Sequence, residues 1–478
     1  MTLRCEAYID GKWRTSASNF PVFNPATHET IAHAPNLGAE ETEEAVTAAH
    51  RAFPAWAAKT AKERAQVMRA WYELMMGDLD RLARLITLEG GKPLAEAKGE
   101  AAYGASFAEW FGEEAKRAYG RTIPTTTAAR RYVTIKQPIG VCAAITPWNF
   151  PMAMITRKAA PALAAGCTIV LKPPSQTPLT ALALAELAER AGVPAGVFNV
   201  VTTNRAAEVG RVLCESPLVR KFSFTGSTGV GKMLGAACVG STVKRISLEL
   251  GGNAPLIVFA DADLDNAVKG AIASKFRNAG QTCVCANRIL VEDAIYDAFS
   301  RKLADAVSSL KVGDGQAEGV EIGPLIDEAA IAKVEHMVAE ATGAGAVALT
   351  GGKRHPAGAQ FYSPTVLANV SREMRVNREE IFGPVAPLIR FRNEDEAVAI
   401  ANDTVFGLAG YFFTRDVNRA WRVAERLEYG MVSINEGVFS NEVIPFGGWK
   451  ESGIGREGGV EGLEEYLETK FVNFGGLA

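Results

Sequence analysis

The sequence predicts an α/β protein built around parallel sheets, and two observations lead to that prediction. Short apolar runs alternate with Ala-rich helical segments between Ile139 and Val258, and a second alternating block runs from Ala267 to about Asn435. Strands that alternate with helices in this way form a parallel sheet with helices on its faces. The length of 478 residues suggests about three domain-sized units at roughly 150 residues each.

The elements follow in chain order. Asp10-Gly11 between short apolar ends predicts a hairpin over 8–13. Apolar residues at three- and four-residue spacing predict helices over 40–58 and 62–88, and the β-branched stretch 122–137 indicates an extended ribbon. Strands are predicted over 141–145, 168–171, 197–201, 221–224 and 256–259, with a helix over 179–191. The tail 465–474 alternates at period two, so we expect it to pair with an exposed sheet edge, such as that of another subunit.

The composition excludes several classes of protein. Hydrophobic residues make up 48% and charged residues 22%, which is ordinary globular usage. The formal charge of −3 does not favour a nucleic-acid partner. No stretch approaches the roughly 18 apolar residues of a membrane span, and the polar N-terminus shows no export signal. Seven scattered cysteines are too few for a disulfide framework. We therefore expect a cytoplasmic protein with no membrane partner.

Three glycine patterns compete as phosphate-binding loops. Gly343 to Ala348 follows a helix and precedes a strand, which is the wrong order, and Gly453 to Gly458 has no apolar strand before it. Gly226-Ser-Thr-Gly229-Val-Gly231-Lys232 has a predicted strand before it and a helix after it. Met233 stands where an NTPase needs a hydroxyl for Mg²⁺, which disfavours that class. The loop suits phosphate, and a purely structural turn is the alternative.

Cys283 lies in a polar, glycine-bearing segment, which weakens the usual interpretation of a cysteine as a small buried apolar residue. The five histidines lie in surface-like contexts, so a Cys-His hydrolase is disfavoured. Cys283 and Cys285 offer two zinc ligands with no companion pair, and we expect no metal site.

Two further segments place polar side chains in apolar surroundings. Asn149, between Pro147 and Pro151, follows a predicted strand in an extended turn. Glu249 stands between leucines; if it is buried, its pKa rises and it suits the role of a general base. The alternative is a glutamate at a strand edge that faces water.

Taken together, these segments resemble the aldehyde dehydrogenase superfamily over nearly the whole chain. Six motifs in family order carry the resemblance: Pro147-Trp-Asn149-Phe-Pro151, Phe224-Thr-Gly-Ser-Thr228, Glu249-Leu-Gly-Gly-Asn253, Gly280-Gln-Thr-Cys283, Glu379-Glu-Ile-Phe-Gly-Pro384 and Pro445-Phe-Gly-Gly448. The segment Lys275 to Cys285, with Phe439 to Glu442, looks most like the succinate-semialdehyde dehydrogenase branch.

The resemblance implies a mechanism for this chain. Cys283 would attack the aldehyde as a thiolate, and the Asn149 amide with the Cys283 N–H would hold the oxyanion. Hydride transfer to a nicotinamide would leave a thioester, which water activated by Glu249 would hydrolyse.

The resemblance also implies an NADP or NAD site. Its contacts would come from Trp148, Lys172, Ser175, Gly226, Ser227, Leu250 and Glu380. Gly226 and Ser227 would lie at the pyrophosphate, and Glu380 would hold the nicotinamide ribose. NAD-preferring relatives often carry Glu at the Ser175 position, so a neutral Ser beside Lys172 favours NADP.

For the substrate, the resemblance implies a carboxylate far from the aldehyde, held by Arg157, Arg277 and Ser440. The alternative is that both arginines pair with nearby acids of the protein. Cys285 would form a redox switch with Cys283, or else it is merely packed.

The expected architecture is an aldehyde dehydrogenase-like α/β fold with three parts. A Rossmann-type NAD(P)-binding domain would comprise 1–119 and 139–248, a catalytic domain 249–454, and a β-ribbon oligomerisation arm 120–138 with 455–478. A homodimer or homotetramer would follow. Rival functions are oxidation of glutarate or 2-oxoglutarate semialdehyde, and a non-catalytic binding protein of the same fold.

Overall fold

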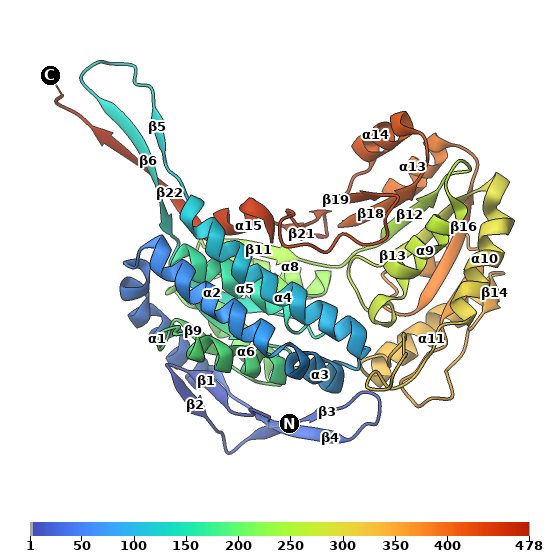
Figure 1. Ribbon diagram of the computed structural model, residues 1–478, viewed down its shortest axis with the longest axis horizontal. Helices are drawn as coiled ribbons and strands as arrows, with labels where there is room; N and C mark the ends of the chain where they lie inside the picture. Colours follow the sequence, from blue (N-terminus) through green and yellow to red (C-terminus); the bar gives the residue numbers. More distant parts are fainter. Residues whose placement is uncertain (1–2, 478) are drawn as a thin grey trace.

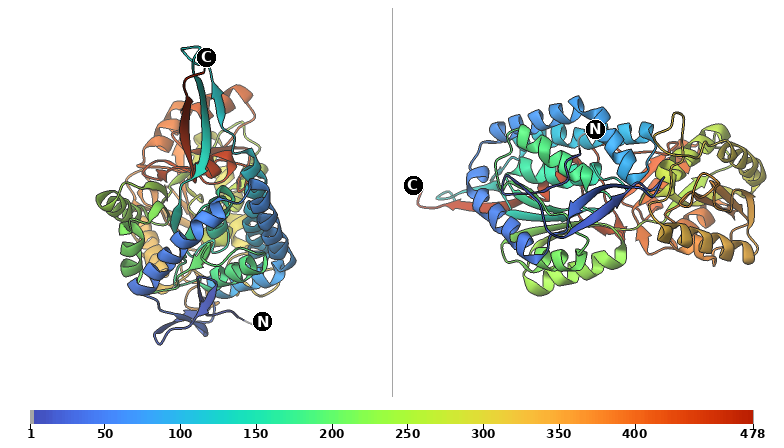
Figure 2. Two further views of the ribbon diagram at one scale, coloured as in Figure 1. Left: turned by 90° about the vertical axis from the view of Figure 1, so that its left-hand side faces the viewer. Right: turned by 90° about the horizontal axis from the view of Figure 1, so that it is seen from below.

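The computed structural model describes residues 3–477 and folds them into two α/β units and a projecting β arm (Figure 1). The two units lie side by side, and the arm extends away from both of them (Figure 2). Within residues 3–477, no helix combines the length and the apolar character that crossing a membrane requires. The predicted α/β class with parallel sheets is confirmed.

The first unit is built on an eight-stranded sheet in the order β2-β1-β9-β8-β7-β10-β11-β21. Its strands are β1 (Ala7–Ile9), β2 (Lys12–Arg14), β7 (Val141–Ile145), β8 (Thr168–Lys172), β9 (Phe198–Val200), β10 (Val219–Thr225), β11 (Arg245–Glu249) and β21 (Gly453–Ile454). The five central strands run parallel, and the pairs at both edges are antiparallel. Parallel strands covered on both faces are apolar throughout, which is why simple apolar runs identified them.

Helices cover both faces of this sheet. One face carries α2 (Ala61–Gly77), α3 (Leu79–Gly90), α4 (Leu94–Glu114), α5 (Ala153–Ala165) and α6 (Leu179–Arg190). The other carries α1 (Ala39–Ala57), α7 (Ala206–Glu215) and α8 (Thr228–Ser241). Within β7, Cys142 and Ala144 pack toward the first set while Val141, Ala143 and Ile145 pack toward the second. This alternation is the period-two pleat of a strand.

The N-terminal hairpin forms as predicted, with Tyr8 opposite Trp13. Asp10 and Gly11 both have positive φ, 53° and 70°. A two-residue turn with positive φ at both positions matches the twist of the flanking strands, which explains the Asp-Gly signal. A second hairpin follows, formed by β3 (Asn19–Phe23) and β4 (Thr30–Pro35).

The second unit has a seven-stranded sheet in the order β14-β15-β16-β13-β12-β18-β19. Its strands are β12 (Ala254–Val258), β13 (Ala286–Glu292), β14 (Val347–Thr350), β15 (Thr365–Ala368), β16 (Val385–Phe391), β18 (Ala409–Phe413) and β19 (Met431–Ile434). The helices are α9 (Leu264–Lys275), α10 (Tyr296–Ser308), α11 (Glu328–Gly343), α12 (Arg375–Arg378), α13 (Glu394–Asn402) and α14 (Val417–Arg426). The edge strand β14 is antiparallel, and the other pairings are parallel. A short ladder of β17 (Phe406–Gly407) and β20 (Trp449–Lys450) adjoins this unit.

The arm is a three-stranded sheet in the order β22-β6-β5, from β5 (Arg121–Ile123), β6 (Arg131–Pro138) and β22 (Leu467–Phe474). The tail thus pairs with β6 of its own chain along its whole length. Within the segment 455–478 predicted for the arm, α15 (Gly459–Glu464) packs against α4 and α5, and Tyr466 joins the core of the first unit. The arm proper begins at Leu467, where the chain leaves that core.

Candidate active site

A cavity of about 280 Å³ lies at the junction of the two units. The segment 250–253 links β11 of the first sheet to β12 of the second at this junction. The cavity receives residues that follow β7, β10 and β11, and Cys283 just before β13. Seven residues predicted for the site line it: Trp148, Asn149, Gly226, Ser227, Leu250, Cys283 and Glu380. The predicted nucleophile and five of the seven predicted cofactor contacts therefore share one space.

Cys283 is presented by a tightly wound backbone. Asn278, Ala279 and Gly280 before it have positive φ of 51°, 54° and 75°. A Cβ at Gly280 would lie 2.1 Å from the Gly383 carbonyl oxygen, so only glycine fits there. Burial raises the pKa of Cys283 to about 12, and Arg157 is the group that opposes this rise. The surrounding protein groups thus favour the neutral thiol at neutral pH.

Asn149 is buried and fixed to the segment that carries the nucleophile. Its side-chain Nδ2 donates to the Gln281 carbonyl at 3.0 Å. Its own carbonyl accepts from the Asn278 Nδ2 at 3.2 Å and from the Lys92 Nζ at 2.9 Å. An amide nitrogen carries two hydrogens, so one N–H of Asn149 is left for a group in the cavity.

Glu249 ends β11 and is 3% exposed, so the alternative of a strand-edge carboxylate in water is wrong. Among residues 3–477, neither of its carboxylate oxygens finds a hydrogen-bond partner. Burial, followed by the negative charge of Glu457, raises the pKa of Glu249 well above its usual range. Its side chain lies outside the lining of the Cys283 cavity.

Arg157 has a partner within the protein that the sequence did not reveal. Its Nε and Nη2 donate to the Glu457 Oε2 at 2.8 and 2.6 Å, and Lys158 pairs with the other oxygen of the same carboxylate. The two cations hold the pKa of Glu457 at about 2 against its burial. The alternative weighed in the sequence, pairing with an acid of the protein, describes this contact, and binding of a substrate carboxylate by Arg157 stays a prediction.

Arg277 differs from Arg157 in this respect. Its Nη1 donates to the Ser440 Oγ at 3.2 Å, so the structure brings together two residues predicted for the substrate. The guanidinium lies 5.1 Å from the centroid of the Phe150 ring. Within residues 3–477, Arg277 forms no ion pair with a carboxylate. It remains available to an anion from outside the chain.

The loop between β10 and α8 has the features of a phosphate site. Ser227 is the N-cap residue of α8, and its side chain accepts no hydrogen bond from the helix. The backbone N–H groups of the first turn of α8 are therefore left for a ligand. A Cβ on Gly226 would lie 2.4 Å from the Phe224 ring, so only glycine fits at this point of the loop. Glu380 accepts the Gly252 N–H at 2.9 Å, and burial raises the pKa of its carboxyl to about 7.

Phe382 and Lys333 are among the lining residues that the sequence did not single out. Phe382 packs edge-on against Trp148 with centroids 5.7 Å apart, and Lys333 donates to the Glu380 carbonyl at 2.7 Å. Phe382 has a φ of 57°, which is unusual for a bulky residue. The motif Glu379 to Pro384 was the signal that marked this region, although it did not single out the aromatic ring.

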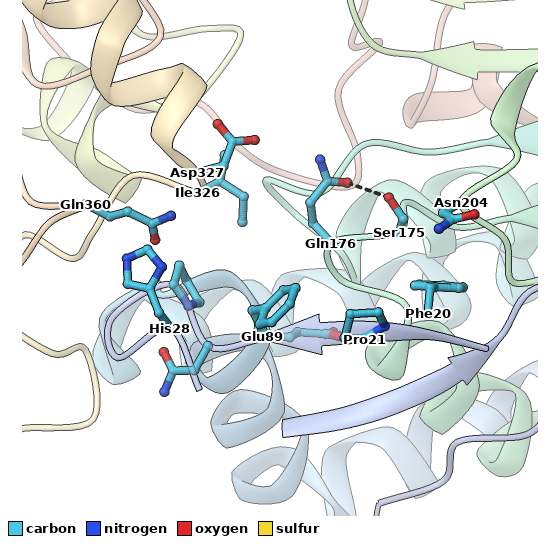
Figure 3. A pocket seen from close by; sticks show the side chains of 13 residues that line it. Phe20, Pro21, His28, Glu89, Ser175, Gln176, Asn204, Ile326, Asp327 and Gln360 are labelled. Carbon is cyan, nitrogen blue, oxygen red and sulfur yellow. Dashed lines mark hydrogen bonds between the residues drawn. The ribbon is translucent and has the colours of Figure 1, made fainter. Parts of the chain in front are cut away.

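Lys172 and Ser175 lie apart from the Cys283 cavity. Lys172 is buried and its Nζ donates to the Pro173 carbonyl at 3.1 Å, while burial lowers its pKa to about 8. Ser175 lines a second cavity of about 350 Å³ (Figure 3). There its hydroxyl lies 3.3 Å from the Gln176 Oε1, as the dashed line shows. Neither residue lines the Cys283 cavity, although Lys172 lies beside the end of β7, where its carbonyl accepts the Thr146 N–H at 3.3 Å.

Cys285 is buried and its Sγ lies 3.6 Å from the Lys275 carbonyl oxygen. It and Cys283 are both free thiols. Lys275 is itself fully buried, and its Nζ has no hydrogen-bond partner among residues 3–477.

Residues 13–472 match the model of the aldehyde dehydrogenase family. The chain is 60% identical to a succinate-semialdehyde dehydrogenase (NADP(+)) of Escherichia coli strain K12, with 99% of this chain and 98% of that protein covered. It is also 60% identical to a glutarate-semialdehyde dehydrogenase of Pseudomonas aeruginosa, with the same shares covered. A crystal structure of succinate-semialdehyde dehydrogenase from Burkholderia pseudomallei superimposes with a TM-score of 0.98 at 57% identity, covering 99% of this chain and 98% of that one.

Proposed function

The chain belongs to the aldehyde dehydrogenase family, and from that membership we propose that it oxidises succinate semialdehyde to the acid with NADP or NAD. One observation carries the proposal: Cys283, the Asn149 amide and the loop at Gly226 and Ser227 line a single cavity. A thiol nucleophile, an oxyanion donor and a phosphate cradle in one space suit dehydrogenation of an aldehyde.

The residues divide the reaction between them. The Cys283 thiol loses its proton to water in the cavity and its sulfur attacks the aldehyde carbon. The oxygen that gains charge is held by the Asn149 Nδ2–H and the Cys283 N–H. NADP or NAD, when bound, accepts the hydride, which leaves a thioester on Cys283. Glu249 then takes a proton from the water that hydrolyses this thioester. Its carboxyl is buried and unpaired within residues 3–477, and burial raises its pKa, which makes the carboxylate a stronger base than an ordinary glutamate.

The carboxylate of the substrate is assigned to Arg277 and Ser440. Arg277 has no carboxylate partner within residues 3–477, whereas Arg157 is already neutralised by Glu457. The 60% identical relative named for glutarate semialdehyde supports a second candidate, a homologous aldehyde one methylene longer. A hydrophobic or neutral pocket discriminates one methylene only weakly, so both substrates are expected to react.

For the cofactor, the helix terminus at Ser227 and the buried Glu380 fit a dinucleotide with a pyrophosphate and ribose hydroxyls. We assign Trp148 and Leu250 to the same ligand because they line the cavity. Lys172 and a neutral Ser175 at the end of β8 support NADP over NAD, since neither repels a 2′-phosphate.

The wider assignments also belong to the proposal. The first unit would bind the cofactor, the second would carry the nucleophile, and the arm would join subunits into a homodimer or homotetramer. We propose a cytoplasmic location, in which the seven free cysteine thiols stay reduced.

Steady-state kinetics test the function. Succinate semialdehyde, glutarate semialdehyde and uncharged butanal would each be offered with NADP and with NAD, and reduced cofactor would be followed by absorbance. We expect the highest kcat/KM for succinate semialdehyde with NADP. Preference for butanal would overturn the substrate assignment. If neither cofactor is reduced with any of the aldehydes, the proposal is wrong and a non-catalytic binding protein is the better interpretation.

A further inference from the structure

Three charged residues at the start of α4 point toward the same side. Glu96 and Glu100 are four residues apart in the helix, so their side chains stack on one face. Lys92 lies two residues before the helix and meets this face through its ion pair with Glu100. All three side chains point toward the two loops that carry Asn149 and Cys283.

Lys92 and Glu100 hold the Asn149 loop by hydrogen bonds at two points. They form an ion pair whose side chains are 2% and 1% exposed. The Lys92 Nζ donates to the Asn149 carbonyl at 2.9 Å and lies 3.6 Å from the Phe150 ring centroid. The Glu100 Oε1 accepts from the Met152 N–H at 3.0 Å, at the start of α5. The loop is thus fixed at Asn149 and again three residues later.

Glu96 holds the segment that carries Cys283 in a similar way. Its Oε2 accepts the Asn278 N–H at 2.8 Å, at the first of the three left-handed residues that precede Cys283. The Asn278 side chain in turn donates to the Asn149 carbonyl, the atom that Lys92 also contacts. One rigid helix therefore holds both halves of the oxyanion site and joins them through a shared carbonyl.

Burying an ion pair costs desolvation that its attraction repays only in part, so stability alone gives little reason for a charged pair here. We propose that Lys92, Glu96 and Glu100 are positioning residues that hold the Asn149 amide at a set place relative to Cys283. This inference rests on the roles proposed above for Asn149 and Cys283. Displacement of a catalytic group by about 1 Å is enough to lower turnover about 100-fold.

A double-mutant cycle tests the proposal. In the full-length enzyme, Lys92→Met should lower kcat about 10- to 100-fold, while KM for the aldehyde and the Kd for NADP change less than about threefold. The same change made in an Asn149→Ala enzyme should cost less than about twofold, because the group that Lys92 positions is already gone. Equal losses in both backgrounds would overturn the proposal.

Lys221→Met is the matched control. Lys221 is another buried lysine with an acidic partner, Glu465, and it contacts neither loop. We expect a comparable loss of thermal stability with kcat within about twofold of the wild type. A loss of kcat as large as that of Lys92→Met would show that destabilisation alone explains the effect.

Two further variants keep the test decisive. If Lys92→Met fails to fold, Glu96→Ala probes the nucleophile side and Glu100→Gln removes the charge while keeping an acceptor for the Met152 N–H. Glu96→Ala should lower kcat and not raise KM, and unchanged kcat would overturn the proposal. The cycle is run with butanal as well as succinate semialdehyde, so an error in the substrate assignment leaves the positioning test intact.

Discussion

Glu249 determines how the second half of the reaction depends on pH. Its pKa is raised by burial, and a base acts only when it is deprotonated. The rate of thioester hydrolysis should therefore increase with pH over a range that lies above the one in which an ordinary glutamate titrates. Pre-steady-state measurements would separate the burst of reduced cofactor from the slower turnover. Glu249→Gln should keep the burst and flatten the pH profile of turnover, whereas an unaltered profile would contradict the base role.

Arg277 and Arg157 allow a matched comparison at the same scale. Arg277→Ala should lower kcat/KM for succinate semialdehyde. The loss should correspond to about 2 to 5 kcal/mol of transition-state stabilisation, the range for losing one member of a buried charge pair. The kcat/KM for butanal, which has no carboxylate, should fall much less. Arg157→Ala should impair both substrates together, because it leaves the buried Glu457 with only Lys158. Equal losses for both aldehydes in Arg277→Ala would make that arginine structural.

Local motifs identify some of these residues, whereas the ion pair between Arg157 and Glu457 depends on the fold. The motifs pointed to Cys283 and Asn149, which line one cavity, because each motif carries its own local chemistry; their catalytic roles and that of Glu249 stay predictions. Glu457 lay in a segment interpreted only as a glycine turn, 300 residues from Arg157. Nothing in a local pattern indicates which distant acid will neutralise a buried arginine, so that pairing required the fold.

At the scale of elements, strands were predicted more accurately than helix ends. The strand over 141–145 was predicted with its observed bounds, because a fully buried strand is an unbroken apolar run. The single helix expected over 62–88 is divided at Asp78 into α2 and α3. The apolar spacing continues across that break, so periodicity could not reveal it. The two-residue strand β21 is too short to have a pattern at all.

The turn from Thr282 to Cys285 gives a prediction about oxidation. Peroxide would convert the Cys283 thiolate to a sulfenic acid and release water; the Cys285 thiol would then displace a second water and form a disulfide. Because Cys285 is buried with its Sγ near the Lys275 carbonyl, this turn must rearrange first. We expect dithiothreitol to restore activity to the oxidised wild type and to restore less in Cys285→Ala. The same recovery in both proteins would show that Cys285 is only packed.

At the scale of the whole molecule, the arm makes a prediction about assembly. Removing residues 467–478 would delete β22 and expose β6, so we expect the oligomer to dissociate or aggregate. Light scattering coupled to size exclusion would report the mass. Removing only 475–478, which lie beyond β22, is the control and should leave the mass of the assembly unchanged. An intact oligomer without β22 would exclude the arm from the subunit contact.

The pairing of β22 with β6 has a consequence for the order of events during synthesis. The two strands are separated by more than three hundred residues of chain, and β22 is the last element to leave the ribosome. Translation proceeds from the N-terminus, so the first unit is complete except for β21 and α15 long before the arm exists. A nascent or prematurely terminated chain thus lacks the finished arm. On the proposal that the arm joins subunits, such a chain lacks the strand that the subunit contact requires.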